Sequence, residues 1–151
     1  MGSDVKQSLT TAEKLLKQGK VDDAVRLCDE VIDDSRGDLL TVNRVGDILA
    51  ATGYGERAVI YYSRIADQFA RQGYYPKAIA IRKKILRLTP DDPRAMVALA
   101  DVYVAQEHPG EARSFYLRAA DTLLQAKDFD AAKEVYSRLV TAEPDDPRHR
   151  V

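Results

Sequence analysis

The segment Pro90-Asp91-Asp92-Pro93-Arg94 decides the fold, because it recurs unchanged as Pro144-Asp145-Asp146-Pro147-Arg148. The first copy begins at position 90 and the second at position 144, and we call this separation the repeat offset. Identical residues recur at the repeat offset through the chain, among them Asp47 with Asp101, Ala51 with Ala105, Ala58 with Ala112, Tyr62 with Tyr116, Arg64 with Arg118, Asp67 with Asp121, and Ala78 with Ala132. A fixed period of about 54 residues predicts stacked units, each of which buries its apolar face against its neighbours. Such arrays present a long surface, which favours binding over catalysis.

Apolar residues recur every three to four positions, and no stretch shows the alternation of a strand, so the pattern predicts helices throughout. Turn residues divide the chain into eight segments, expected near residues 4–18, 21–34, 38–52, 55–72, 75–88, 92–106, 109–126 and 129–142. Glycines that can adopt the left-handed conformation end several of them: Gly19, Gly37, Gly53 and Gly73. Aspartates that can cap the next helix follow the turns: Asp38, Asp92, Asp128 and Asp146. Pro93 and Pro147 then fit the first helical position.

The bulk composition narrows the class of protein. The chain has 151 residues, enough for one domain with one continuous core. Its 23 basic and 24 acidic residues give a net charge of −1, which disfavours a nucleic-acid binder. Cys28 is the single cysteine, so there is no intrachain disulfide. No apolar run reaches the ~18 residues of a membrane span, and the N-terminus lacks a signal-peptide core. We therefore expect a cytoplasmic protein without direct membrane insertion.

Small residues mark both helices of each predicted hairpin. In the second helices they are Ala24, Ala58, Ala78, Ala112 and Ala132, followed four residues later by the bulkier Cys28, Tyr62, Arg82, Tyr116 and Tyr136. In the first helices they are Gly46, Ala66, Ala100 and Ala120, followed three residues later by Leu49, Phe69, Tyr103 and Leu123. A small residue lets two helix backbones approach closely, and the large one fills the space a turn further on.

This pattern resembles the tetratricopeptide repeat (TPR), a helix–turn–helix unit of about 34 residues. The resemblance covers roughly residues 5 to 147, and Pro90 and Pro144 match the family's proline. The tryptophan usual in the family's first helix is absent. The resemblance implies an all-α fold, a right-handed α-α superhelix (a TPR-like solenoid) of about eight antiparallel helices.

The spacing departs from a plain array of such units. The key alanines stand at positions 24, 58, 78, 112 and 132, so that long and short steps alternate. The long step equals the family's unit of about 34 residues, and the short step is about 20 residues. A short step arises if one helix serves two hairpins, so segments 55–72 and 109–126 would each be shared. The unit would then be three helices in about 54 residues, and the shared helices would be the longest and the most buried.

Three parts of the chain are expected. Residues 1–3, Met-Gly-Ser, are typical of an expression scar. Residues 4–147 form a single TPR-like solenoid domain. Residues 148–151 align with the opening turn of the helix that begins at Pro93, and they are expected to start a truncated further repeat of a longer protein.

The sequence carries no catalytic constellation. Its two histidines, His108 and His149, fall in a turn and near the C-terminus, and no glycine-rich phosphate loop follows a strand. Helix capping explains the acid pairs of the repeated segment. We expect no enzyme activity, no cofactor and no metal site.

An acid follows the small residue of every first helix: Glu13, Asp47, Asp67, Asp101 and Asp121. In the family, this part of the first helix lines an inner concave groove. The resemblance therefore implies partner-binding groove residues Glu13, Leu40, Asn43, Asp47, Val97, Asp101 and Val104. Such a groove favours a protein or peptide segment that carries basic residues with apolar anchors. The alternative is that these acids are solvated, helix-compatible residues copied with the unit. An acidic lining would repel a terminal carboxylate, which argues against the family's chaperone-tail clamps.

A second candidate partner surface combines tyrosines with basic residues, the composition of interaction hot spots. It comprises Tyr61, Arg71, Tyr74, Arg82 and Lys84. The alternative is an ordinary solvated helix face.

The predicted function is a non-catalytic protein–protein interaction scaffold or adaptor that presents a preformed groove. Two alternatives stay open: a self-associating, homo-oligomeric organiser, and a regulatory module of a larger multidomain protein.

Overall fold

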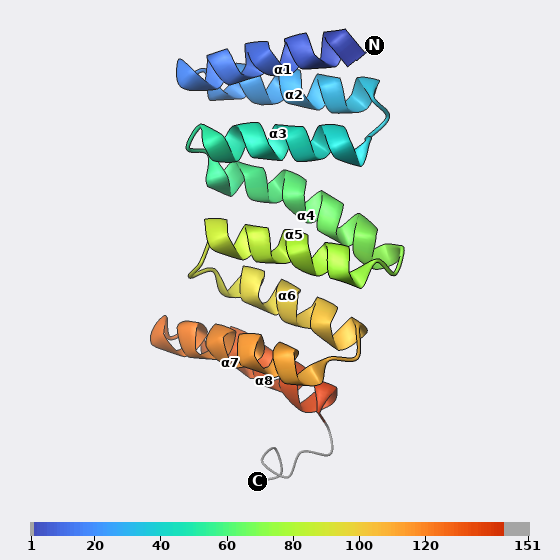
Figure 1. Ribbon diagram of the computed structural model, residues 1–151. Helices are drawn as coiled ribbons and strands as arrows, with labels where there is room; N and C mark the ends of the chain where they lie inside the picture. The colour runs from blue at the N-terminus through green and yellow to red at the C-terminus, as the bar shows by residue number, and fades with distance from the viewer. Residues whose placement is uncertain (1, 144–151) are drawn as a thin grey trace. The chain divides into compact units, whose positions relative to one another are not determined.

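The computed structural model describes residues 2–143, which form eight helices and no strand (Figure 1). The helices are α1 (Gly2–Lys17), α2 (Val21–Asp34), α3 (Leu39–Ala51), α4 (Gly55–Arg71), α5 (Tyr75–Leu88), α6 (Pro93–Ala105), α7 (Pro109–Gln125) and α8 (Phe129–Ala142). Every boundary lies within two residues of the predicted one. The all-α class is confirmed. The second copy of the repeated segment and the expected further repeat at residues 148–151 lie outside the described residues, as does Met1 of the expected scar.

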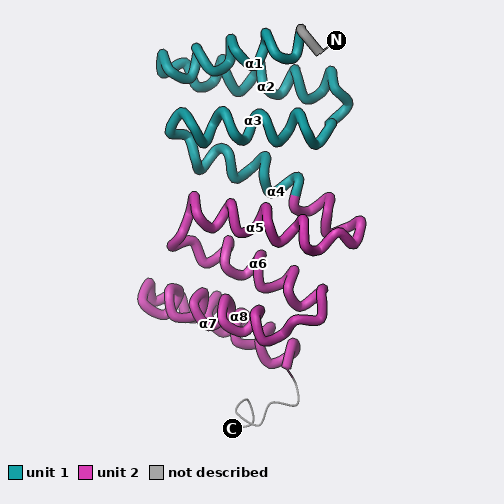
Figure 2. Tube along the Cα trace, viewed as in Figure 1, with its two compact units in different colours: residues 1–65 teal, residues 66–151 magenta. Residues whose placement is uncertain are grey.

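The chain divides into two compact units, residues 1–65 (unit 1) and residues 66–151 (unit 2), coloured separately in Figure 2. In unit 1, α1 packs against α2, and α3 contacts both. In unit 2, α6 packs against α5 and α7, and α7 packs against α8. The division falls within α4, which contributes residues to each unit. The single domain over residues 4–147 stays a prediction.

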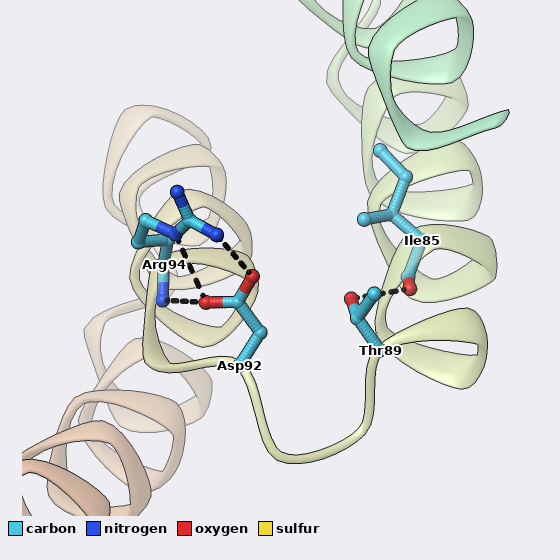
Figure 3. Close-up of polar contacts among 4 residues, drawn as sticks. All are labelled: Ile85, Thr89, Asp92 and Arg94. Atoms are coloured by element: carbon cyan, nitrogen blue, oxygen red, sulfur yellow. Dashed lines mark hydrogen bonds and ion pairs between the residues drawn. The ribbon is translucent and has the colours of Figure 1, made fainter. Parts of the chain in front are cut away.

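The first copy of the repeated segment ends one helix and begins the next, as Figure 3 shows. Thr89 Oγ1 donates to the carbonyl of Ile85 at 3.1 Å in the last turn of α5. The Asp92 carboxylate accepts from the Arg94 N–H at 2.9 Å and from the Arg94 guanidinium at 3.1 and 3.2 Å. Partial burial alone would raise the pKa of Asp92, but the hydrogen bonds from Arg94 outweigh it and lower that pKa. The predicted caps Asp38, Asp92 and Asp128 are all confirmed.

Turns of one geometry close helices with and without glycine. After α3, Gly53 has φ +91°, and the N–H of Tyr54 donates to the carbonyl of Leu49 at 2.8 Å. After α6, the aligned Glu107 has φ +64°, and the N–H of His108 donates to the carbonyl of Tyr103 at 2.8 Å. A residue other than glycine loses about 1–2 kcal/mol of stability when its backbone is left-handed. The turn after α6 therefore has the same geometry as the turn after α3, but Glu107 makes it less stable.

The longest described helices are α4 and α7, at 17 residues each, as the shared-helix interpretation predicts. The expectation that they are the most buried is wrong. Four of 17 residues of α7 are buried, against six of 13 in α6. The charged residues Arg113, Arg118 and Asp121 interrupt the apolar positions of α7, whereas Asp101 is the one charged residue of α6 after its first turn.

Gly46 of α3 marks a close approach between a helix backbone and a side chain in unit 1. A Cβ built there would lie 2.6–3.0 Å from three ring atoms of Tyr62, whose side chain is fully buried. Glycine therefore leaves the space that the tyrosine ring fills between α3 and α4.

Gly46→Ala should destabilise the protein. Overpacking of this kind costs about 1–3 kcal/mol, against about 1 kcal/mol gained from the helix propensity of alanine. The control is Gly110→Ala in α7, where a Cβ meets nothing within 4 Å. Urea unfolding followed by circular dichroism should show lower stability for the first variant and equal or higher stability for the second. Equal stability of Gly46→Ala and the parent would contradict this packing.

Candidate functional site

The acids predicted to line a groove make a repeated contact across their own hairpins. Tyr62 Oη donates to Asp47 Oδ1 at 2.5 Å, and Tyr116 Oη donates to Asp101 Oδ1 at 2.5 Å. In the hairpin of α4 and α5, Arg82 takes the tyrosine's place, and its Nη2 donates to Asp67 Oδ1 at 2.5 Å. Each donor lies fifteen residues after its acid. The acid thus joins the first helix of a hairpin to the second.

The tyrosine hydroxyls stay protonated at neutral pH, as a donor must. Burial is the main cause that raises the pKa of Tyr62 above its ordinary value of 10.0, and the neighbouring Asp47 carboxylate adds to it. Burial followed by Asp101 raises the pKa of Tyr116 in the same way. A second buried tyrosine of α4, Tyr61, donates to Asp29 Oδ1 at 2.8 Å, and burial followed by Asp29 raises its pKa.

Asp101 also links α6 to α8. Its second oxygen, Oδ2, accepts from Arg138 Nη1 at 2.6 Å, and Arg138 Nη2 lies 3.5 Å from Glu134 Oε1. Asp101 and then Glu134 raise the pKa of Arg138. Asp101 is therefore a hydrogen-bond acceptor for two other helices, and its charge is balanced by a cation.

The remaining acids of the series differ. Glu13 pairs with Lys17 one turn later in α1 at 3.0 Å, and Asp121 is exposed on α7. The contacts of Asp47, Asp67 and Asp101 favour the structural interpretation of this series. Contact with a ligand stays a prediction.

Tyr116→Phe should destabilise unit 2, because it leaves one oxygen of Asp101 without its buried donor. Hydrogen bonds to charged groups contribute about 1.5–3 kcal/mol. The control is Tyr136→Phe at the equivalent position of the last hairpin, where the side chain is 39% exposed and water can replace the hydroxyl contact. Urea unfolding should show the loss for the first variant and almost none for the second. Equal effects would rule out a special role for the buried hydrogen bond.

Stability should also depend on alkaline pH. A tyrosine whose pKa is raised in the folded state contributes stability that is complete below its unfolded pKa, near 10, and is lost as pH rises further. The difference in unfolding free energy between the parent and Tyr116→Phe should therefore shrink between about pH 9 and pH 12. A difference that stays constant over this range would show that Tyr116 titrates alike in both states.

Unit 2 contains a hollow between α6 and α8, with a volume of about 290 Å³. We call it the α6–α8 hollow, and its lining residues are Pro93, Arg94, Val97, Ala98, Asp101, Leu123, Ala131, Glu134, Val135 and Arg138. Apolar residues from three helices form its floor. Two acids and two arginines lie around it, and Arg138 pairs with both Asp101 and Glu134. A neighbouring hollow shares Glu134 and Arg138 and includes Val104. Unit 2 thus brings the predicted residues Val97, Asp101 and Val104 to one surface.

Unit 1 contains a hollow between α1 and α3, the α1–α3 hollow, with a volume of about 430 Å³. Its lining residues are Lys6, Leu9, Thr10, Glu13, Arg44, Asp47 and Ile48. The structure brings the predicted residues Glu13 and Asp47 together here. Asn43 is half-buried and donates to Asp47 at 3.4 Å, and Leu40 is exposed on the same helix. This lining is mainly charged, with two acids and two cations.

The members of the second predicted patch differ in exposure. Tyr61 belongs to unit 1 and is buried, with 4% exposure, because it packs inward and bonds to Asp29. The other members belong to unit 2. There Arg71 donates to Gln68, Arg82 to Asp67, and Lys84 is half-buried. Tyr74 is 52% exposed, and Lys77 Nζ lies 5.2 Å from its ring centroid, within range of a cation–π contact.

The cations beside the acids were missed by the sequence reasoning. Arg138 carries a signal only after the helices are placed side by side, because it lies 37 residues from Asp101, on another helix. Arg44 lines the α1–α3 hollow with Asp47. The sequence showed a series of acids, and the structure shows charge-balanced linings.

The described residues contain no group of three or more His, Cys, Asp and Glu side chains that could hold a metal ion. Over the same part of the chain, no helix combines the length and apolar character of a membrane span. The α6–α8 hollow, with its apolar floor and the ion pairs of Arg138 beside it, is suited to holding a peptide surface by contact.

Comparison with known sequences identifies the family. Two sequence models of the tetratricopeptide repeat match the chain, one over residues 64–122 and the other over residues 113–151. The chain belongs to the tetratricopeptide-repeat family, whose members are in general protein–protein interaction modules. No curated protein matches the sequence.

Solved structures of similar proteins include MamA residues 41 to the end from Desulfovibrio magneticus RS-1, with 18% identity, coverage of 97% of this chain and 98% of that one, and a TM-score of 0.38. A tetratricopeptide repeat protein from Parabacteroides merdae has 14% identity, coverage of 95% and 68%, and a TM-score of 0.35. A thermophilic TPR protein from Thermus thermophilus has 15% identity, coverage of 97% and 95%, and a TM-score of 0.32.

Proposed function

We propose that this protein is a non-catalytic interaction scaffold that holds a segment of a partner protein in the α6–α8 hollow. The observation that carries the proposal is the floor of this hollow, where α6, α7 and α8 each contribute apolar side chains beside an open surface. An apolar side chain of a partner can enter this space without displacing any part of the fold.

The floor sets the first requirement on the partner. Val97 and Ala98 of α6 face Ala131 and Val135 of α8, with Leu123 of α7 beside them. These residues are half-buried or buried, so an aliphatic or aromatic anchor would remove the rest of their surface from water. Each apolar Å² buried contributes about 25 cal/mol, which makes the anchor the main source of affinity.

The rim sets the second requirement. Glu134 is an exposed acid that pairs with Arg138 at 3.5 Å, a distance at which the pair is weak. A basic residue next to the anchor can share Glu134, which agrees with the predicted partner of basic residues and apolar anchors. The α1–α3 hollow offers Glu13 and Asp47 for the same purpose. Because cations stand beside these acids, we expect the basic residue to add selectivity and the anchor to supply affinity.

Charge reversal at Asp101 is a poor test of this proposal. Asp101 accepts from Tyr116 and Arg138, so Asp101→Lys would disturb the packing of α7 and α8 as well as the rim. A substitution in the floor of the α6–α8 hollow that leaves every hydrogen bond in place is a better test, because it changes peptide binding without disturbing the fold.

Ala98→Leu should take up part of the α6–α8 hollow and weaken peptide binding. A random peptide library displayed on phage is selected on the parent protein, and the enriched peptides are synthesised. We expect them to share an apolar anchor flanked by Lys or Arg, and to bind Ala98→Leu at least about tenfold more weakly, a loss of about 1.4 kcal/mol. Fluorescence anisotropy measures both affinities.

The matched control is Ala105→Leu, the same substitution at an exposed position of the same helix. It should bind the selected peptides as the parent does. Equal binding by Ala98→Leu would place the peptide elsewhere and reject the α6–α8 hollow, and a library that yields no enriched peptide would argue against the scaffold function itself.

A further inference from the structure

Arg138 of α8 lines the α6–α8 hollow, and its guanidinium meets an acid at each end. Its Nη1 donates to Asp101 Oδ2 at 2.6 Å, and its Nη2 lies 3.5 Å from Glu134 Oε1. These contacts lie along the edge of the guanidinium, because its N–H bonds point outward in the plane of the group. The two flat faces of the guanidinium are therefore left for another kind of contact.

No ring covers these faces within the described part of the chain. Every contact of Arg138 there is with an acid, and no aromatic side chain lies within cation–π range of it. The Arg138 side chain is 45% exposed, and it lines the neighbouring hollow as well as the α6–α8 hollow. Open space therefore lies on more than one side of the guanidinium.

Two other arginines of the chain show the contact that Arg138 lacks. Arg64 Cζ lies 5.5 Å from the ring centroid of Tyr61 in α4. At the repeat offset, Arg118 Cζ lies 5.6 Å from the ring centroid of Phe115 in α7. In both helices the ring comes three residues before the arginine, which places the two side chains next to each other on the helix surface.

Helix α8 has an aliphatic residue where α4 and α7 have a ring. Three residues before Arg138 is Val135, which is buried in the floor of the α6–α8 hollow. Val97, Ala98 and Ala131 continue this floor and are half-buried. The volume of about 290 Å³ is near the lower end of the range of ligand pockets, about 300–1,000 Å³, which suits one large side chain. A ring that lies on Val135 would meet Arg138.

We propose that the α6–α8 hollow selects an aromatic side chain, Phe, Tyr or Trp, as the anchor of its partner, and that Arg138 determines this preference. The ring lies on the apolar floor and meets one face of the guanidinium, which attracts the π electrons of the ring. Because Asp101 already holds the guanidinium, little conformational entropy is lost when the ring binds. This inference rests on the proposed function and narrows it, since the floor alone accepts aliphatic and aromatic side chains.

The test compares two anchors that differ in their π electrons. An alanine scan of a peptide enriched on the parent protein identifies the anchor, and the peptide is then synthesised with phenylalanine or cyclohexylalanine at that position. The saturated ring has the larger apolar surface, so burial alone favours cyclohexylalanine. Contact with Arg138 favours phenylalanine, and we expect the phenylalanine peptide to bind the parent at least about threefold more tightly in fluorescence anisotropy.

Two matched substitutions locate this preference. Arg138→Lys keeps a cation beside Asp101 but removes the flat guanidinium, so the two peptides should bind this variant about equally. Arg118→Lys is the control, because Arg118 lies over Phe115 in the same unit and does not line the hollow. It should keep the preference of the parent. Circular dichroism checks that each variant keeps the parent's helical signal.

Three results would overturn the inference: enriched peptides with Leu, Ile or Met as the anchor, a cyclohexylalanine peptide that binds the parent as tightly as the phenylalanine peptide, and a preference that survives in Arg138→Lys. Weaker binding by Ala98→Leu would still support the α6–α8 hollow in each of these cases. A library without enriched peptides, or equal binding by Ala98→Leu, would instead reject the proposed site, and the aromatic preference with it.

Discussion

The structure depends on one contact, the hydrogen bond from a buried side chain of the second helix of a hairpin to an acid of the first. Tyr62 reaches Asp47 in unit 1, and Tyr116 reaches Asp101 in unit 2. The tyrosine ring can reach the acid because the residue just before the acid, Gly46 or Ala100, is small and leaves room beside the backbone of the first helix. In these two hairpins the small residue, the acid and the large donor therefore act together, whereas Glu13 pairs within its own helix and Asp121 is exposed.

The fold could be predicted closely from the sequence because its signals are local. Three capping aspartates and the three-to-four spacing of apolar residues placed all eight helices. The turns at Glu107 and Lys127, which align with Gly53 and Gly73, keep the left-handed backbone without glycine, with φ of 64° and 61°. Burial was harder to predict: α6 is more buried than α7, because burial depends on which faces the neighbouring helices cover.

The candidate site was predicted less completely, because it depends on contacts between separate helices. The acids were visible as a series, but their partners lie fifteen or 37 residues away, on other helices. Tyr61 is a second example. A tyrosine near basic residues suited an exposed hot spot, yet its ring is buried and its hydroxyl donates to Asp29 of α2. Sequence pattern identified the recurring acids and left open which residues face a partner.

The hairpin of α4 and α5 differs from its neighbours in a way that ionic strength can reveal. Its contact between helices is an ion pair, Arg82 with Asp67, and the Asp67 side chain is 54% exposed. Dissolved salt screens exposed ion pairs, while the buried tyrosine hydroxyls of the other two hairpins are shielded from it. Concentrated salt therefore weakens the contact between α4 and α5 more than it weakens the tyrosine contacts of the other two hairpins.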